Sequence, residues 1–200
     1  MKIVFPTKAG IEEAAQALRR GEIVAYPTET VYGLGVDPYT PGAIECLYAI
    51  KGRDAAIPVL LIAAENEHMD RVARSISPAA RRCMEVFWPG PLSLVLPAAP
   101  DLPTSLLGPG ATVCVRRTSS PIAADLCRAF GGAIVSTSAN LSGQPPARSA
   151  QGISLDGVSI VVDGGELDDA LPSTVFDPDT RVIHREGAIS RPMIERALDR

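Results

Sequence analysis

Two short polar motifs contain residues that suit chemistry on a nucleotide. Lys51-Gly52-Arg53 places a point cation and a planar bidentate donor on either side of a glycine, an arrangement that suits a polyphosphate. Ser138-x-Asn140 lies in a turn of small residues and offers a hydroxyl and an amide to a phosphate or a ribose. Each motif also has an ordinary interpretation: a solvated basic helix end for the first and a simple polar turn for the second.

Two other segments suit the remaining parts of a small substrate. The segment from Pro27 to Gly35 (P-T-E-T-V-Y-G-L-G) is polar and rich in glycine, and it directly follows a buried strand, where sheet enzymes often place ligand groups. Arg116-Arg117 stands at a strand end, where a guanidinium fork could bind a carboxylate. The alternatives are a capped turn in which Gly33 and Gly35 serve backbone geometry, and a surface pair of arginines on an edge strand.

Strands and helices alternate along the chain and would position these segments. We expect helices at 11–20, 40–49, 77–87, 120–130 and 190–198. We expect short apolar strands at 22–26, 59–62, 92–96, 112–115, 133–136, 159–162, 173–176 and 181–184. Some strands follow each other without a helix between them, so the sheet should be mixed, in an α/β fold that some schemes class as α+β. Neither a G-x-G-x-x-G nor a Walker A sequence occurs, so another element must hold any phosphates.

Size and composition predict one soluble domain. The chain has 200 residues, of which 46% are hydrophobic, which is enough for one sizeable core. The longest apolar run, Ala55 to Ala64, contains Pro58 and is about half of the roughly 20 residues that a membrane span needs. The first residues lack a signal-peptide pattern, so a cytoplasmic location and no membrane partner are expected.

Cysteine spacing and charge exclude two other classes of site. The four cysteines form no C-x-x-C pair and there are only two histidines, so no metal site of the protein's own is expected. The net charge is −4, which argues against a protein held on nucleic acid by its overall charge. Any contact with RNA would therefore have to be local.

Taken together and in order, the motifs resemble those of the YrdC family of L-threonylcarbamoyladenylate synthases. The matching segments cover nearly the whole chain and are 27–35, 51–53, 88–96, 113–116, 137–143, 173–175 and 185–189. The combination of K-x-R and S-x-N with P-T-E-T-V-Y-G-L-G upstream is the specific feature. The resemblance is to the bacterial TsaC-like short form, with a single domain over 1–200. It implies a three-layer fold with a twisted mixed sheet around a cationic cavity.

The resemblance implies synthesis of L-threonylcarbamoyl-AMP from L-threonine, bicarbonate and ATP, with release of pyrophosphate, for threonylcarbamoyladenosine modification of tRNA. The amine of threonine would take up carbon dioxide as a carbamate, whose oxygen attacks the α-phosphate of ATP. Positioning and charge neutralisation carry such a reaction. Mg²⁺ is expected with the triphosphate, and tRNA-modifying transfer proteins would receive the product. Binding of tRNA or double-stranded RNA is also attributed to the family.

The resemblance also implies a role for individual residues. Lys51 and Arg53 would be the catalytic cations. The positions that match contacts to ATP are Lys51, Arg53, Thr112, Ser138, Asn140 and Arg185. The positions that match contacts to threonine are Thr30, Arg116, Ser136 and Ser173. No residue is implied as a metal ligand.

The sequence departs from the family's usual pattern at several of these contacts. Asp54 replaces a proline, Ile57 an asparagine that touches the nucleotide, and Ile62 a histidine that touches threonine. Thr118 and Ser120 stand where a proline and a histidine are customary, and Pro146 stands where a serine or threonine is common. Two alternatives to the synthase follow: a divergent paralogue that acts on another amino acid, and an RNA-binding protein without synthase activity.

Overall fold

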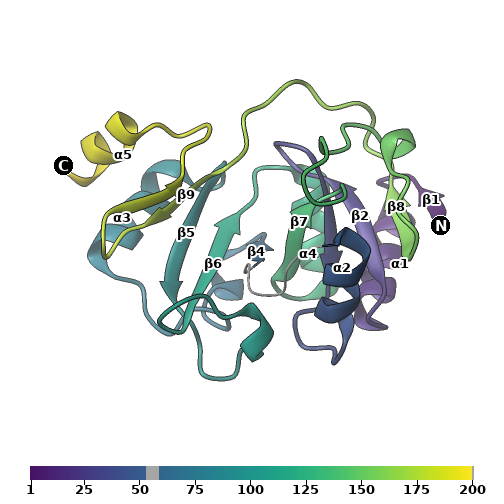
Figure 1. The fold of residues 1–200 in the computed structure, drawn as a ribbon, viewed down its shortest axis with the longest axis horizontal. Coiled ribbons are helices and arrows are strands. Elements are labelled where there is room, and N and C mark those ends of the chain that lie inside the picture. Colours follow the sequence, from purple (N-terminus) through teal and green to yellow (C-terminus); the bar gives the residue numbers. More distant parts are fainter. Residues whose placement is uncertain (53–58, 200) are drawn as a thin grey trace.

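Ten strands form one sheet in a computed structural model that describes residues 1–52 and 59–199 (Figure 1). The strand order is β1-β8-β2-β3-β7-β4-β6-β5-β9-β10. The strands are β1 (Lys2–Val4), β2 (Ile23–Pro27), β3 (Tyr32–Val36), β4 (Leu60–Ala63), β5 (Leu92–Pro97), β6 (Thr112–Arg117), β7 (Ile134–Ser138), β8 (Val158–Val162), β9 (Thr174–Asp177) and β10 (Val182–Arg185). Arg53, Asp54 and Ile57 lie outside the described residues.

The sheet is mixed, as the sequence predicted. Strand β8 pairs in parallel with both β1 and β2, and the pairs β4–β6 and β5–β9 are also parallel. The other pairs, β2–β3, β3–β7, β4–β7, β5–β6 and β9–β10, are antiparallel. Direct hairpin connections alternate with helical crossovers, which accounts for the two kinds of pairing.

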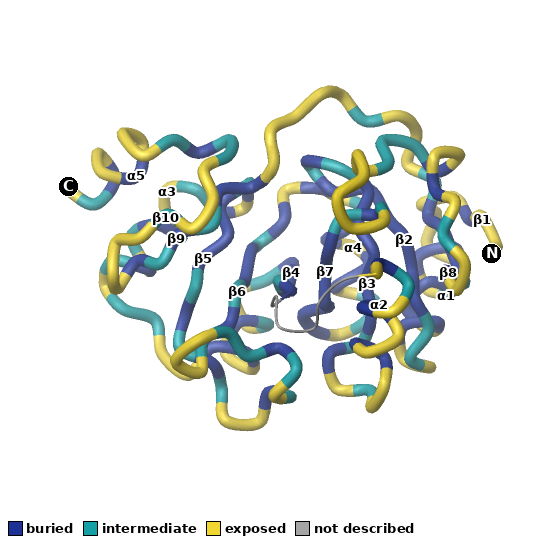
Figure 2. The backbone as a smooth tube through the Cα atoms, in the orientation of Figure 1, coloured by how far each residue is buried: buried dark blue, intermediate teal, exposed yellow. Residues whose placement is uncertain are grey.

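Helices cover both faces of the sheet and give three layers. The helices are α1 (Lys8–Arg19), α2 (Ala43–Lys51), α3 (Pro78–Phe87), α4 (Pro121–Phe130) and α5 (Arg191–Leu198). One apolar cluster packs α1 and α4 on one face, and a larger cluster contains residues of α2, α3 and α5. The central strands are almost entirely buried between these layers (Figure 2). Within the described chain, no helix has the length and apolar character that a membrane crossing requires.

Helices α3 and α4 begin where the Ser-Pro signal predicts, and α2 does not begin at its predicted residue. Ser77 and Ser120 accept hydrogen bonds from Ala80 N and Ala123 N, so they cap α3 and α4 as expected. The predicted start of α2 at Thr40 is wrong. The Thr40 hydroxyl donates to Asp37 at 2.8 Å, and Gly42, with φ +79°, turns the chain before the helix begins at Ala43.

The glycine-rich segment after β2 is mostly a strand and only briefly a turn. Gly33 and Gly35 lie in β3, next to β7, although both were interpreted as possible turn glycines. A Cβ on Gly33 would lie 3.2 Å from Ser136 Oγ, and one on Gly35 would lie 2.7 Å from Tyr26 Cε1. These glycines therefore allow close approach of side chains from neighbouring strands.

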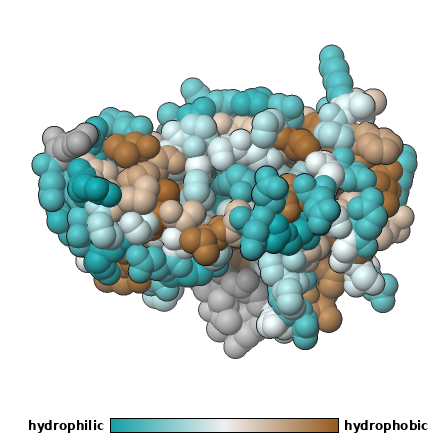
Figure 3. Space-filling view, turned by 90° about the horizontal axis from the view of Figure 1, so that it is seen from above, coloured by the Kyte–Doolittle hydropathy of each residue, from teal (hydrophilic) through white to brown (hydrophobic). Residues whose placement is uncertain are grey.

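A long segment, 163–173, connects β8 to β9 and runs along the top of the view from the half of the molecule that holds β8 to the half that holds β9 (Figure 1). The Tyr32 hydroxyl holds its start by accepting from Gly164 N at 3.0 Å and donating to Gly165 O at 2.8 Å. Arg148 holds its middle by donating to Leu167 O at 2.9 Å. The segment is mostly exposed, and hydrophilic side chains separate small apolar areas on this face (Figure 3).

Gly187 supports the far end of this segment. A Cβ at Gly187 would lie 2.1 Å from Pro172 O and 2.9 Å from the carbonyl carbon of Ser173. We expect Gly187→Ala to lower the free energy of unfolding by about 2 kcal/mol, because backbone atoms cannot move away cheaply. Urea unfolding measures the change. Gly132→Ala is the control, since its Cβ would meet nothing nearer than 3.8 Å; an equal loss in both variants would contradict the packing argument.

Candidate active site

One face of the sheet carries the predicted site residues of β6 and β7. Cys114 of β6 and Ser136 of β7 both pair with Leu60 of β4, so they lie in one row across three strands. Side chains alternate between faces along a strand, so residues two or four positions away project from the same face. The predicted residues on this face are Thr112, Arg116, Ser136 and Ser138.

Lys51 ends α2 with its ammonium inside the Ser138–Asn140 turn. Its side chain is almost fully buried, at 3% exposure. Nζ donates to Ser138 O at 2.5 Å, to Asn140 O at 2.8 Å and to Asn140 Oδ1 at 3.1 Å. Gly52, with φ +56°, ends the helix just after Lys51. The K-x-R lysine and the S-x-N turn are thus brought together, and the lysine is a structural part of the turn.

The hydrogen bonds of the Thr28–Thr30 turn fix the direction in which the Thr30 hydroxyl donates. Thr28 Oγ1 donates to Val31 O at 2.6 Å, so its hydrogen is already used. The 3.1 Å contact between Thr28 Oγ1 and Thr30 Oγ1 therefore has Thr30 as its donor. The lone pairs of Thr30 Oγ1 remain suited to accept a hydrogen bond from an amine or a hydroxyl.

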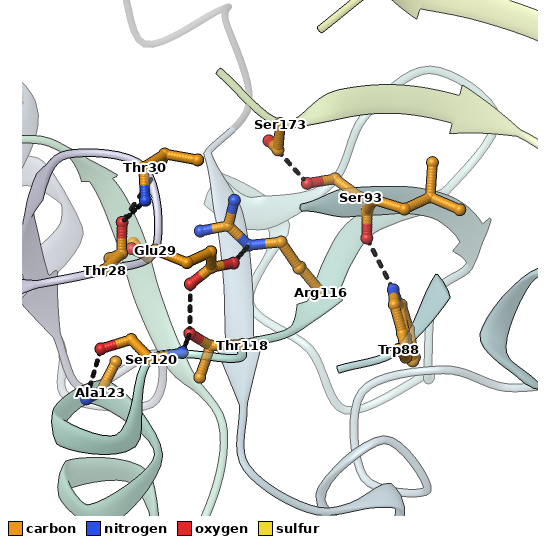
Figure 4. Close-up of polar contacts among 12 residues, drawn as sticks. Thr28, Glu29, Thr30, Trp88, Ser93, Arg116, Thr118, Ser120, Ala123 and Ser173 are labelled. Atoms are coloured by element: carbon orange, nitrogen blue, oxygen red, sulfur yellow. Dashed lines mark hydrogen bonds and ion pairs between the residues drawn. The ribbon is translucent and has the colours of Figure 1, made fainter. Parts of the chain in front are cut away.

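Arg116 meets the carboxylate of Glu29 below this turn. The Nε atom of Arg116 lies 3.2 Å from Glu29 Oε1, and the Arg116 side chain is 4% exposed. Glu29 Oε2 accepts a hydrogen bond from the Thr118 hydroxyl at 2.6 Å. Figure 4 shows the guanidinium between Thr30 and Ser173, with its Nε atom next to the Glu29 carboxylate. A planar fork in this orientation suits a carboxylate.

Ser173 is held from two sides at the start of β9. Its hydroxyl oxygen accepts from Ser93 Oγ at 3.0 Å and from Arg185 Nη2 at 3.0 Å. Arg185 Nε also donates to Ser173 O at 3.0 Å. Both lone pairs are thus in use, and the hydroxyl hydrogen of Ser173 is available for donation. Arg185, which was predicted to contact ATP, thus holds Ser173, which was predicted to contact threonine.

Ser136 is bound to a buried tyrosine. The Tyr26 hydroxyl donates to Ser136 Oγ at 2.8 Å. Burial raises the pKa of Tyr26 far above its ordinary value, an effect that the hydrogen bond to Ser136 only partly offsets. Tyr26 therefore stays a neutral donor, and the hydrogen of Ser136 can be donated to another group.

Cys114 is half-buried and lies between Thr112 and Arg116 on the same face of β6. Burial raises the pKa of its thiol to about 11, and the nearby charges of Arg116 and Arg185 lower that value only in part. The thiol is therefore neutral at physiological pH. It contributes an uncharged surface beneath the polar groups.

Thr112 lies apart from the predicted threonine contacts. It is four residues before Arg116 on an extended strand, about 13 Å away along the chain. Its hydroxyl donates to Pro109 O at 2.9 Å. Thr112 lies two residues beyond Cys114, and Ser138 lies two residues beyond Ser136 in the same direction across the sheet. Because Lys51 bonds the turn at Ser138, Thr112 lies at the end of this face that Lys51 occupies.

The predicted cationic cavity stays a prediction. Two hollows, of about 250 and 580 Å³, lie beside Tyr39 and Arg71, which are not predicted site residues. In the described part of the chain, no three His, Cys, Asp or Glu residues are grouped to hold a metal ion. The cations that the structure places at the candidate face are Lys51, Arg116 and Arg185.

The arrangement resembles that of known proteins over nearly its full length. The family model for Sua5, YciO and YrdC proteins, described as telomere recombination, matches residues 16–187. The chain belongs to this family. The membership that the motifs predicted is therefore confirmed.

Relatives of this family member are named threonylcarbamoyl-AMP synthase. The relative from Alkalilimnicola ehrlichii is 45% identical over 165 residues, which is 82% of this chain and 84% of the relative. The one from Thiobacillus denitrificans is 45% identical over 170 residues, or 84% of this chain and 90% of the relative. A longer relative from Bacillus subtilis is 37% identical over 94% of this chain and 56% of its own length.

Solved structures confirm the predicted YrdC-like fold. P. abyssi Sua5 in complex with L-threonine has a TM-score of 0.91 and 34% identity, over 98% of this chain and 59% of that one. E. coli YciO has a TM-score of 0.83 and 27% identity, over 94% and 95% of the two chains.

The structure places two of the departures from the family pattern differently. Ile62 is fully buried and packs in the apolar cluster of α1 and α4. Pro146 is exposed. Ile62 also pairs with Arg116 in the register of β4 and β6, so its side chain projects from the same face of the sheet and places an apolar group beside Arg116.

Sequence reasoning missed four residues that organise the site. They are Tyr26, Glu29, Ser93 and Thr118, which bond Ser136, Arg116, Ser173 and Glu29 respectively. Glu29 and Ser93 lie inside the quoted motifs, and the polar Ser93 between Leu92 and Leu94 was a usable signal. Thr118 was marked only as a departure from the family pattern, and Tyr26 gave no signal, because its partner is distant in sequence.

Lys51→Met tests the structural role of the ammonium. The variant leaves the carbonyl oxygens of Ser138 and Asn140 buried without their donor, so the free energy of unfolding should fall by about 3 kcal/mol. Urea unfolding gives the value. Lys8→Met is the control, because Lys8 is exposed on α1. Unchanged stability of Lys51→Met would mean that the turn does not depend on this lysine.

Thiol alkylation tests the protonation state of Cys114. At about pH 8, iodoacetamide should modify the exposed Cys46 and leave Cys114 unmodified, because Cys114 is a neutral thiol. Between about pH 8 and 10 the Cys114 rate should rise about tenfold per pH unit, because only the thiolate reacts and the pH stays below the pKa. Mass spectrometry of the folded protein measures both rates. A plateau below about pH 9 would contradict the raised pKa.

Proposed function

We propose that this chain makes L-threonylcarbamoyl-AMP from L-threonine, bicarbonate and ATP, with release of pyrophosphate, for tRNA threonylcarbamoyladenosine modification. The observation that carries the proposal is its 45% identity to threonylcarbamoyl-AMP synthases over more than four fifths of the chain. The relatives confirm the predicted enzyme class, a synthase of the nucleotidyltransferase type.

L-Threonine would bind where acceptor and donor groups surround the Arg116 fork. The terminal nitrogens of Arg116 would bind the carboxylate, and Thr30 Oγ1 would accept from the amine or hydroxyl. Ser136 and Ser173 each have a hydroxyl hydrogen to donate. The L-threonine complex of P. abyssi Sua5, a relative with the same fold, supports this proposal.

ATP would bind at the other end of the face. Ser138 and Asn140 form the turn there, Lys51 brings a positive charge to it, and Thr112 lies on the same side. Arg53 follows Lys51 by two residues and would reach the phosphates. Arg185, which bonds Ser173 beside the proposed threonine contacts, would reach the nucleotide from that end. We propose these six positions as the nucleotide contacts.

The residues would act by positioning and by charge. The carbamate formed on the threonine amine must approach the α-phosphate in line with the leaving pyrophosphate, and the two ends of the face hold the two reactants for this. Lys51 and Arg53 would stabilise the negative charge that grows on the phosphates. No side chain of the site is needed as a nucleophile.

Several finer predictions belong to this proposal. Mg²⁺ would enter with the triphosphate, since it commonly binds substrate phosphates and keeps several waters. Transfer proteins that modify tRNA would take the product, and a cytoplasmic location suits that task. The single sheet that joins both ends of the chain supports one domain over 1–200.

Pyrophosphate release provides the test. Turnover of ATP should require both L-threonine and bicarbonate, and a panel of other amino acids should give little product. Arg53→Gln should lower kcat about 100-fold, since it removes one donor to the transition-state charge. It is a cleaner probe than a Lys51 variant, because Lys51 also holds the turn.

Arg20→Gln is the matched control, because Arg20 is an exposed arginine just after α1. Its kcat should stay within about twofold of the wild-type value. Turnover with another amino acid would favour the divergent paralogue. No turnover by folded protein would overturn the synthase and leave tRNA or double-stranded RNA binding as the alternative.

A further inference from the structure

The Arg116–Glu29 pair has an unusual geometry. Both side chains are largely withdrawn from solvent, at 4% and 12% exposure, and Arg116 Nε lies 3.2 Å from Glu29 Oε1. The two atoms are close enough for an ion pair but are not aligned as a hydrogen bond, and neither has another hydrogen-bond partner among the described residues. The pair is therefore held by charge, and its orientation must be fixed from elsewhere.

Thr118 fixes the carboxylate. Its hydroxyl donates to Glu29 Oε2 at 2.6 Å and accepts from Ser120 N at 3.2 Å, so the hydroxyl hydrogen has a set direction. Thr118 N donates to Ala63 O at 3.1 Å, which ties this residue to the end of β4. The hydroxyl that holds Glu29 is thus anchored to the sheet.

The contact through Nε decides where the guanidinium points. Glu29 occupies the Nε side of the planar group, and the two terminal nitrogens face the space between Thr30 and Ser173 (Figure 4). A contact through a terminal nitrogen would instead have used part of the fork that suits a carboxylate. The carboxylate also balances the buried charge of Arg116.

We propose that Glu29, held by the Thr118 hydroxyl, is a positioning residue that aims Arg116 at the carboxylate of the amino-acid substrate. The inference rests on the proposed function, because it concerns the affinity for L-threonine. Thr118 stands where the family pattern has a proline, so the hydroxyl is a feature of this chain. Neither Glu29 nor Thr118 needs to touch the substrate.

Thr118→Val tests this role, because it removes the hydroxyl and keeps the shape. The dissociation constant for L-threonine, measured by titration calorimetry without ATP, should rise about tenfold, the equivalent of one hydrogen bond to a charged group. KM for threonine should rise in parallel, while kcat and KM for ATP stay within about twofold. Thr118→Ser keeps the hydroxyl and should restore the affinity.

Two controls separate positioning from a general structural effect. Thr40→Val removes a similar hydroxyl-to-carboxylate bond, from Thr40 to Asp37 at 2.8 Å, and should leave threonine affinity unchanged. In an Arg116→Lys background, Thr118→Val should add less than about a twofold loss, because no fork remains to be aimed. Thr118→Ala repeats the test if the valine disturbs packing.

The outcomes are distinct. Threonine binding by the wild type with no loss in Thr118→Val and Thr118→Ala would overturn the positioning role alone. A tenfold loss that persists in the Arg116→Lys background would also overturn it, because Thr118 would then act independently of Arg116. Absence of threonine binding by folded wild-type protein would overturn the proposed function as well.

Discussion

Two cations are buried beside the sheet, and the loops of the candidate site are arranged around them. Lys51 and Arg116 are 3% and 4% exposed. A buried charge without partners is strongly unfavourable, so the fold must bring oxygen atoms to each one. Carbonyl oxygens of Ser138 and Asn140 meet the ammonium, and the Glu29 carboxylate meets the guanidinium. The turn after β7 and the turn before β3 are thereby fixed.

The same arrangement divides the site into two ends. One end carries the cation and the polar turn that suit phosphates, and the other carries the guanidinium and hydroxyl groups that suit an amino acid. The neutral Cys114 thiol and Ser136 lie between them in one row of the sheet. A reaction that joins an amino-acid derivative to a nucleotide needs both ends at once, and a rigid sheet keeps their spacing constant.

The departures from the family pattern affect this arrangement unequally. Ile62 packs in the core with α4 and lies beside Arg116 on the neighbouring strand, so an apolar side chain stands there where the family pattern has a histidine. Thr118 and Ser120, in contrast, supply hydroxyls at the site: Thr118 donates to Glu29, and Ser120 donates to Pro27 O at 2.9 Å. The segment after β6 therefore makes new contacts where the customary proline and histidine are missing.

The sequence by itself determined the family and the order of all the helices and most of the strands. Apolar runs located β2, β5 and β8 to within about two residues, and the Ser-Pro caps located the starts of α3 and α4, because these signals are local. It missed β1, since three residues carry little periodicity, and β3, since Gly33 and Gly35 look like turn residues until their neighbours are known. Local chemistry also identified Lys51, Arg116 and the S-x-N turn as candidates.

Only the tertiary structure decided how these groups are used. That Lys51 holds the S-x-N turn depends on the approach of α2 to β7, almost 90 residues apart in sequence. That Glu29 meets Arg116 and Thr118 depends on the order of strands between β3 and β6. A hydrogen bond or an ion pair acts only over a few ångströms, and no sequence pattern specifies which distant residues the sheet will bring within that range.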